Sequence, residues 1–218
     1  MWMYHPSLVY GDTMTAIELS QIQLDALRET SSIAAGNAAT SLSVMLGKKV
    51  DISVPTIMVE ATGKIPEALG GEENIVSAIY FLVSGQLSGS ILLMLSVSES
   101  LRLVNILTGQ KVDQIDGING MGISAIKELG NITIGTYLRA LGQTLKLKIT
   151  YSIPGFASDM LGALLDGTLA ELSLKSEHVV MAENKFIVEE DVYRGHLIFI
   201  LDPKSLHIML KALEARGI

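Results

Sequence analysis

The sequence contains no cysteine among its 218 residues. Disulfide bridges and thiolate metal sites are therefore excluded, and a reducing compartment such as the cytoplasm is the expected location. Charged residues are also scarce, at 18%, whereas hydrophobic residues make up 49%. This composition excludes intrinsic disorder and predicts that much of each secondary-structure element is buried.

The sequence also lacks any basic cluster. Lys and Arg total 16 against 23 Asp and Glu, which gives a net charge of −7. A nucleic-acid-binding surface needs a positive stripe that neutralises phosphates, so no nucleic-acid partner is predicted. The histidines His5, His178, His196 and His207 are scattered without metal-ligand spacing, so no metal site is predicted.

One uncharged stretch, from Ile75 to Ser98, is long enough for a membrane span. Turn-forming Ser and Gly residues at 84–86 and 88–90 interrupt it, and a β-rich run lies on each side. Two buried strands with a tight connection explain the stretch better than a membrane helix does, so no membrane association is predicted.

The first 14 residues lack the basic start and long apolar run of a signal peptide. They are expected to form a flexible leader, and their aromatic residues leave a partner-binding tail as the alternative. Residues 15–218 are expected to form a single domain.

That domain contains an internal repeat. A shift of 99 positions places residues 25–55 on residues 124–154 without a gap. Identical pairs include Ala26/Ala125, Glu29/Glu128, Gly36/Gly135 and Pro55/Pro154. The two repeats extend over about 20–115 and 119–218, and such halves are expected to pack about a pseudo-twofold axis.

Local signals place the main elements of each repeat. A capping box at Ser20 and Gln23 begins a long helix that is expected to end near Leu46, and the matching helix is expected over about 120–142. Strands are expected at 48–54, closed by Pro55, and at 145–153, with a helix capped by Ser98 between the repeats' long helices. Further strands are expected around 169–174, 178–181, 186–188 and 197–201, and a last helix after Asp202-Pro203. The fold class is therefore α+β, with long helices on an antiparallel sheet.

Each long helix carries a polar stripe. Spacings of four, three and four place Ser124, Glu128, Asn131 and Gly135 on one face, and the first repeat has Asp25, Glu29, Ser32 and Gly36 there. Asn is a poor residue for a helix interior, and each mid-helix glycine costs about 1 kcal/mol relative to alanine. These costs are expected where another surface approaches the helix closely. An ordinary solvent-exposed face, and glycines that serve packing between helices, are the alternatives.

The spacing Ser124-x3-Glu128-x2-Asn131-x22-Pro154 resembles the signature of the CheC/CheX/FliY chemotaxis phosphatases. The resemblance covers both repeats, from about Ser20 to the last residue, and lacks the additional C-terminal domain of FliY. It implies a CheC-like fold, a pseudo-twofold repeat of helix, strands and helix.

The resemblance also implies an activity, namely hydrolysis of the aspartyl phosphate on a phosphorylated CheY-like response regulator. It implies that Asn131 orients the attacking water and that Glu128 pairs with a lysine of the regulator, with Ser124 and Pro154 in supporting roles. No cofactor of the chain's own is expected, because the Mg²⁺ belongs to the regulator. An acyl phosphate is already reactive, so a helper that positions water needs no general base.

The first repeat departs from this signature. It keeps Asp25, Glu29 and Pro55, but Ser32 stands where the signature has Asn. A serine hydroxyl is shorter than an amide, so this degenerate site is expected to bind weakly and to be catalytically poor. Two alternatives to an enzyme are a scaffold that binds CheY-like regulators and an adaptor for the CheD receptor deamidase. A monomer is expected, because two repeats supply internally what other members build by dimerising.

Overall fold

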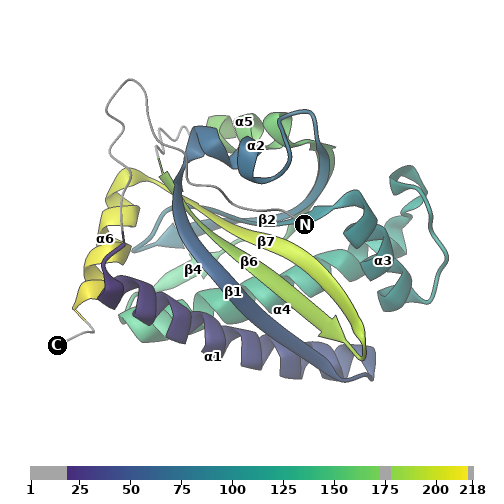
Figure 1. The fold of residues 1–218 in the computed structure, drawn as a ribbon, viewed down its shortest axis with the longest axis horizontal. Helices are drawn as coiled ribbons and strands as arrows, with labels where there is room; N and C mark the ends of the chain where they lie inside the picture. Colours follow the sequence, from purple (N-terminus) through teal and green to yellow (C-terminus); the bar gives the residue numbers. More distant parts are fainter. Residues whose placement is uncertain (1–18, 172–177, 216–218) are drawn as a thin grey trace.

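The computed structural model describes residues 19–171 and 178–215, so the expected leader at 1–14 lies outside the described residues. Helices pack on an antiparallel sheet, and the predicted α+β class is confirmed (Figure 1). The helices are α1 (Gln21–Leu46), α2 (Ile65–Ala68), α3 (Val97–Thr108), α4 (Gly120–Leu145), α5 (Leu161–Glu171) and α6 (Pro203–Glu214). The strands are β1 (Val50–Ala61), β2 (Ile75–Gly85), β3 (Gly89–Ser96), β4 (Ile149–Tyr151), β5 (Gly155–Met160), β6 (His178–Val188) and β7 (Asp191–Leu201).

Local capping interactions determine where the two long helices begin and where α1 ends. The capping box of α1 is present, because the Gln23 amide donates to Ser20 Oγ at 3.2 Å and the Ser20 amide donates to Gln23 Oε1 at 2.9 Å. Gly47 ends α1 in the left-handed region, at φ 63°. Asn119 caps α4 by accepting from two backbone amides. Both helices have 26 residues, and α4 follows α1 by the 99-residue repeat.

The uncharged stretch forms β2 and β3, as predicted. No helix in the described part of the chain is long and apolar enough to span a membrane. The last helix begins at Pro203 under an Asp202 cap, which also matches the prediction. The cap of α3, however, is Ser96 rather than Ser98, because the Ser96 hydroxyl accepts from the Glu99 amide at 3.2 Å.

Three strand predictions are corrected by the structure. Pro55 does not close the first strand, since β1 continues to Ala61 through a register shift between Ser53 and Thr56. This is tolerated because β1 is an edge strand, where a missing amide breaks no central ladder. The matching strand in the second repeat is divided into β4 and β5. Residues 169–171 end helix α5 instead of forming a strand, and 172–174 lie outside the described residues.

Strands of the two repeats are interleaved in the sheet. The order is β1-β6-β7-β3-β2-β4, and β5 also pairs with β2. The first strand of each repeat therefore pairs with the hairpin of the other repeat, β1 with β6 and β4 with β2. The order reads symmetrically about the β7–β3 pair.

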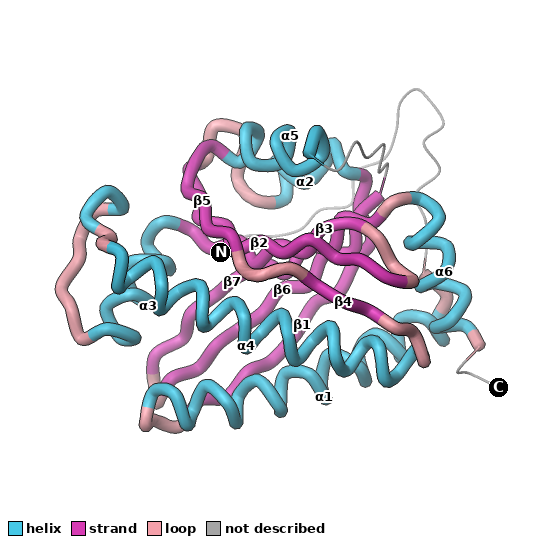
Figure 2. The backbone as a smooth tube through the Cα atoms, turned by 180° about the vertical axis from the view of Figure 1, so that it is seen from behind, coloured by secondary structure: helices cyan, strands magenta, loops and turns pink. Residues whose placement is uncertain are grey.

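The sheet has a hydrophobic core on each face, because successive side chains of a strand point to opposite sides. Ile79 and Phe81 of β2 enter the larger core with α1, α3, α4 and α6, and Val76 and Ala78 enter the smaller core with α2 and α5. Seen from behind, α1 and α4 lie side by side under the sheet, and α2 and α5 lie on its other side (Figure 2).

A buried hydrogen bond joins the two long helices. The Ser31 hydroxyl donates to the Leu27 carbonyl at 2.7 Å, so the Tyr137 hydroxyl, 2.5 Å from Ser31 Oγ, donates to that oxygen. The Tyr137 ring packs on Phe199 at 5.1 Å. Burial raises the pKa of Tyr137 to about 12, against a smaller opposing effect of the Ser31 hydrogen bond.

The glycines of the long helices have different surroundings, which gives the first prediction. A Cβ at Gly130 would lie 2.5 Å from Ile79 Cγ2 in the core, whereas one at Gly36 would meet nothing within 4 Å. We expect Gly36→Ala to stabilise the protein by about 0.5–1 kcal/mol through helix propensity. We expect Gly130→Ala to destabilise it by about 1–3 kcal/mol through overpacking. Urea denaturation measures both, and equal effects would contradict this account.

The buried Tyr137 should make the folded protein less stable at alkaline pH. Its pKa is near 10 in an unfolded chain and about 12 in the fold. The folded state therefore keeps a proton that the unfolded state loses, so this contribution is complete below pH 10 and is lost as the pH rises toward 12. Tyr137→Phe should cost about 1 kcal/mol at pH 8, since one hydrogen bond is lost.

Between pH 10 and 12 the wild type should then lose about 1.4 kcal/mol per pH unit more than the variant. Denaturant titrations from pH 8 to 11 compare the two proteins, and other alkaline groups cancel in the comparison. Parallel stability curves above pH 10 would show that Tyr137 is not responsible.

Candidate functional site

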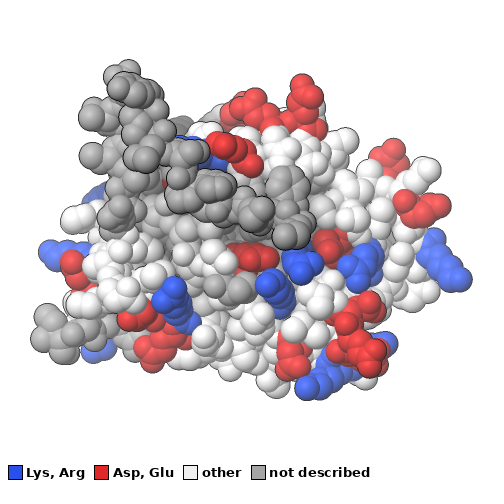
Figure 3. Space-filling view, in the orientation of Figure 1, with Lys and Arg blue, Asp and Glu red and all other residues white. Residues whose placement is uncertain are grey.

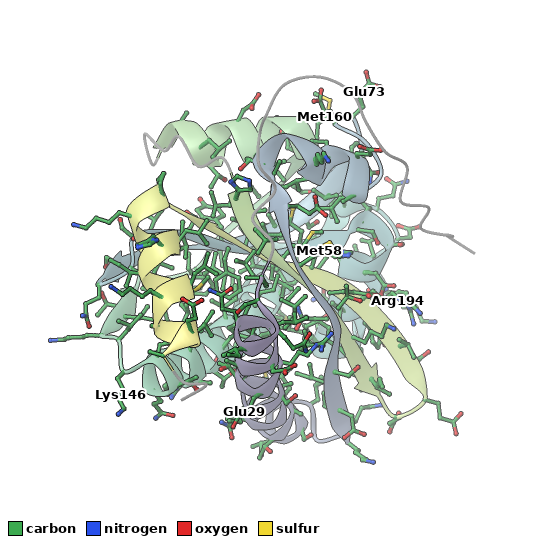
Figure 4. The ribbon with its side chains drawn as sticks, turned by 60° about the vertical axis from the view of Figure 1, so that its left-hand side comes forward. Glu29, Met58, Glu73, Lys146, Met160 and Arg194 are labelled. Carbon is green, nitrogen blue, oxygen red and sulfur yellow. The ribbon has the colours of Figure 1, made fainter. Side chains whose placement is uncertain are left out.

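The polar stripes lie on faces of α1 and α4 that are exposed along most of their length. In the second repeat Ser124 and Glu128 are exposed, Asn131 is half-buried and Gly135 is buried. In the first repeat all four stripe residues are exposed, and Glu29 projects from the surface of α1 (Figure 4). The structure therefore keeps both predicted sets together on helix faces, and only the second set is partly covered, at Asn131 and Gly135.

Glu128 and Asn131 differ from the other polar residues of α4 in their hydrogen bonding. Ser124 donates to the Gly120 carbonyl at 2.8 Å, and Thr133 donates to the Leu129 carbonyl at 2.8 Å. The side chains of Glu128 and Asn131 have no hydrogen bond or ion pair with any described residue. Their carboxylate and amide, one helical turn apart, are therefore available to a partner molecule.

Two side chains of the first stripe make their polar contacts within α1. Asp25 accepts from Gln21 Nε2 at 2.9 Å and pairs with Arg28 at 3.6 Å. The Ser32 hydroxyl donates to the Arg28 carbonyl at 2.9 Å, so its proton points back at the helix rather than outward. At the position of the amide in the second stripe, the first stripe thus presents a short hydroxyl with a local acceptor.

The mid-helix glycines do not make room for an approaching partner. Gly130 lies against Ile79 of β2, and a Cβ at Gly135 would lie 2.8 Å from the Tyr151 hydroxyl. Tyr151 is fixed edge-on to Phe81, with ring centroids 5.8 Å apart. Both glycines therefore serve internal packing, but against strands of the sheet and not against another helix, as the alternative had it.

Pro154 lies at a break in the edge strand. β4 ends at Tyr151, and the Ser152 amide still donates to the Leu82 carbonyl at 3.0 Å while the Leu82 amide donates to Ser152 Oγ at 3.1 Å. β5 then resumes pairing at Gly155, opposite Tyr80. The chain leaves the ladder at Ile153 and Pro154, which suits a residue without an amide proton.

Sequence analysis missed Tyr151 and Ile153. Ile153 is 89% exposed, and Tyr151 lies over Gly135 in the same stripe as Asn131. Gly135 alone does not predict this contact, because its counterpart Gly36 has nothing within 4 Å. Nothing in the sequence pattern indicates that Ile153 turns outward, because its counterpart Val54 packs on the core.

Acidic and basic side chains are interspersed over the lower half of the face seen in Figure 3, the side on which α1 lies. No group of three or more His, Asp or Glu suited to a metal ion occurs within residues 19–171 and 178–215. The chemistry that this site offers is therefore one carboxylate that can bind a cation and one amide that can orient water.

Comparison with known proteins identifies relatives of the chain. The model of the CheC-like family matches residues 22–59 and 121–158, one segment in each repeat. The chain is 29% identical over 201 residues to the CheY-P phosphatase CheC of Bacillus subtilis, which covers 90% of this chain and 96% of that protein. It is 28% identical over 138 residues to the flagellar motor switch phosphatase FliY of the same organism, over 63% of this chain and 36% of that protein.

Solved structures share the fold at lower identity. Thermotoga maritima FliY superposes with a TM-score of 0.73 at 19% identity, covering 91% of this chain and 98% of that one. FliM from a Helicobacter pylori FliM–SpeE complex superposes with a TM-score of 0.69 at 13% identity, covering 92% and 99%. At these identities the likeness establishes the fold.

The free side chains of α4 lead to a prediction about stability. Asn131 makes no side-chain hydrogen bond to a described residue and lies inside a helix, where alanine is favoured by about 0.5 kcal/mol. Asn131→Ala should therefore leave the protein as stable as the wild type or about 0.5 kcal/mol more stable. Thr30→Ala is the control and should lose stability, because the buried Thr30 hydroxyl donates a hydrogen bond to the Ala26 carbonyl. Chemical denaturation measures both, and a loss above about 1 kcal/mol at Asn131 would reveal a structural role instead.

Proposed function

Because the chain belongs to the CheC-like family, we propose that it is a phosphatase that hydrolyses the aspartyl phosphate of a CheY-like response regulator in chemotaxis. The observation that carries this proposal is the unpaired Glu128 and Asn131 on one face of α4, at the spacing of the phosphatase signature. The 29% identity to a CheY-P phosphatase over 90% of the chain supports the same activity.

The proposed mechanism is one of positioning. The Asn131 amide holds a water in line with the phosphorus, and the water oxygen forms the new P–O bond as the bond to the aspartyl oxygen breaks. The departing aspartate carboxylate is a stable anion, and the water's proton passes to phosphate or solvent. Glu128 pairs with a lysine of the regulator and so fixes the orientation of the two proteins.

The regulator supplies the remaining chemistry of this proposal. On this proposal Mg²⁺ held by the regulator would neutralise charge on the phosphoryl oxygens, and no residue of this chain is assigned to a cofactor. Ser124 and Pro154 support the site by their place on the helix face and at the break in the edge strand. A substrate of this class would place the protein in the cytoplasm.

The first stripe is proposed to be catalytically poor. Ser32 is both too short to replace Asn131 and engaged with the Arg28 carbonyl. Asp25 is likewise engaged with Gln21 and Arg28. One working site per chain follows, although the helices have equal lengths.

The test is dephosphorylation of a CheY-like regulator that has been loaded by a small phosphodonor. Wild-type protein should accelerate phosphate loss, and Glu128→Ala and Asn131→Ala should each reduce that acceleration about 100- to 1000-fold, as loss of one positioning group typically does. Glu29→Ala is the matched control on the first stripe and should keep nearly full activity.

Two results would contradict this assignment. An equal loss in Glu29→Ala and Glu128→Ala would mean that both sites work. No acceleration by wild type, with binding retained, would leave the alternative of a scaffold for regulators or an adaptor for CheD.

A further inference from the structure

Ile153 is the most exposed large apolar side chain in the described part of the chain, at 89%. Its counterpart 99 positions earlier, Val54, is packed against the larger core. The two repeats thus treat the same position in opposite ways. Exposing an aliphatic side chain forgoes the stabilisation that its burial would bring.

The backbone on both sides of Ile153 is fixed. Ser152 exchanges hydrogen bonds with Leu82 through its amide and its hydroxyl, at 3.0 and 3.1 Å, and that hydroxyl lies 2.9 Å from the Ile153 carbonyl. On the other side Gly155 pairs with Tyr80. A side chain on such a fixed segment loses little conformational entropy when a partner covers it.

Two contacts define the course of this segment along α4. Ile149 lies beside Gly142 and Tyr151 lies beside Gly135, so the strand advances toward the beginning of α4. Ser152 still pairs with Leu82 and Gly155 with Tyr80, so the chain keeps this direction after Tyr151. Ile153 therefore lies beyond Gly135, on the side of Asn131 and Glu128.

From this placement we propose that Ile153 is a substrate-contact residue, which packs against the folded phosphorylated regulator beside the Glu128–Asn131 pair. The inference rests on the proposed function, because the regulator must come close enough for Asn131 to reach its phosphoryl group. An apolar side chain on that side of Gly135 is then covered in the complex, where it contributes affinity and helps to exclude bulk water. The first stripe lacks such a residue, since Val54 is turned into the core.

Steady-state dephosphorylation of the loaded regulator separates this role from catalysis. We expect Ile153→Ser to raise KM about ten-fold with kcat nearly unchanged, because a buried apolar contact is lost from binding alone. Asn131→Ala should show the reverse, a large fall in kcat with a small change in KM. Ile153→Leu should retain the wild-type KM.

Val44→Ser is the matched control, because Val44 is 81% exposed on α1 and belongs to neither stripe. It should leave both constants unchanged. Binding to a beryllofluoride-loaded regulator gives an independent readout, in which Ile153→Ser should also raise the dissociation constant about ten-fold. Thermal melting of each variant verifies that the exposed substitutions leave the fold intact.

The outcomes distinguish the two proposals. Wild-type activity combined with an unchanged KM and unchanged binding in Ile153→Ser would overturn the role of Ile153 and leave the phosphatase intact. The proposed role of Ile153 would also be overturned if Ile153→Ser only converted a dimer to a monomer in sedimentation. That result would assign the residue to a contact between copies of the chain. A wild-type protein without phosphatase activity would overturn the proposed function, and this inference with it.

Discussion

The exchange of edge strands between the repeats is the constraint on which the rest of the structure depends. β1 pairs with β6 and β4 pairs with β2, so neither repeat completes a sheet alone. Each long helix leads directly into an exchanged strand. The pairing of these strands therefore brings α1 and α4 side by side on the same face of the sheet, and their outer faces form one surface (Figure 2).

This arrangement explains why equal helices carry unequal sites. On their buried sides, α1 and α4 pack against each other and are joined by the Ser31–Tyr137 hydrogen bond. Outside, the difference arises from the exchanged strands. β1 passes Pro55 with a register shift and continues, whereas the second strand breaks, brings Tyr151 onto Gly135 and turns Ile153 outward. A half-buried Asn131 beside a strand break is a different environment from an exposed Ser32 on an open helix.

The sequence predicted the elements that depend on local chemistry. The capping box at Ser20, the turn between β2 and β3 and the Asp202-Pro203 start are short-range signals, and the structure confirms each of them. The cap of α3, at Ser96 instead of Ser98, was a local error, whereas the error at Pro55 arose where tertiary pairing decides. Pro55 was predicted to end a strand, but it lies in an edge strand, and an edge position cannot be recognised from one strand alone. For the site, spacing placed Glu128 and Asn131 on one face, but their freedom from internal hydrogen bonds and the course of residues 151–154 depend on contacts between distant segments.

The strand exchange also has a consequence for how the two halves can diverge. The inner face of α1 is required by the sheet and by α4, whereas its outer face has no comparable duty in the described structure. A duplicated unit of this kind can therefore abandon its chemistry without becoming dispensable. Its surface, with Ile22, Ile33 and Val44 exposed along one side of the helix, can change without disturbing the packing that holds α4 and its site in place.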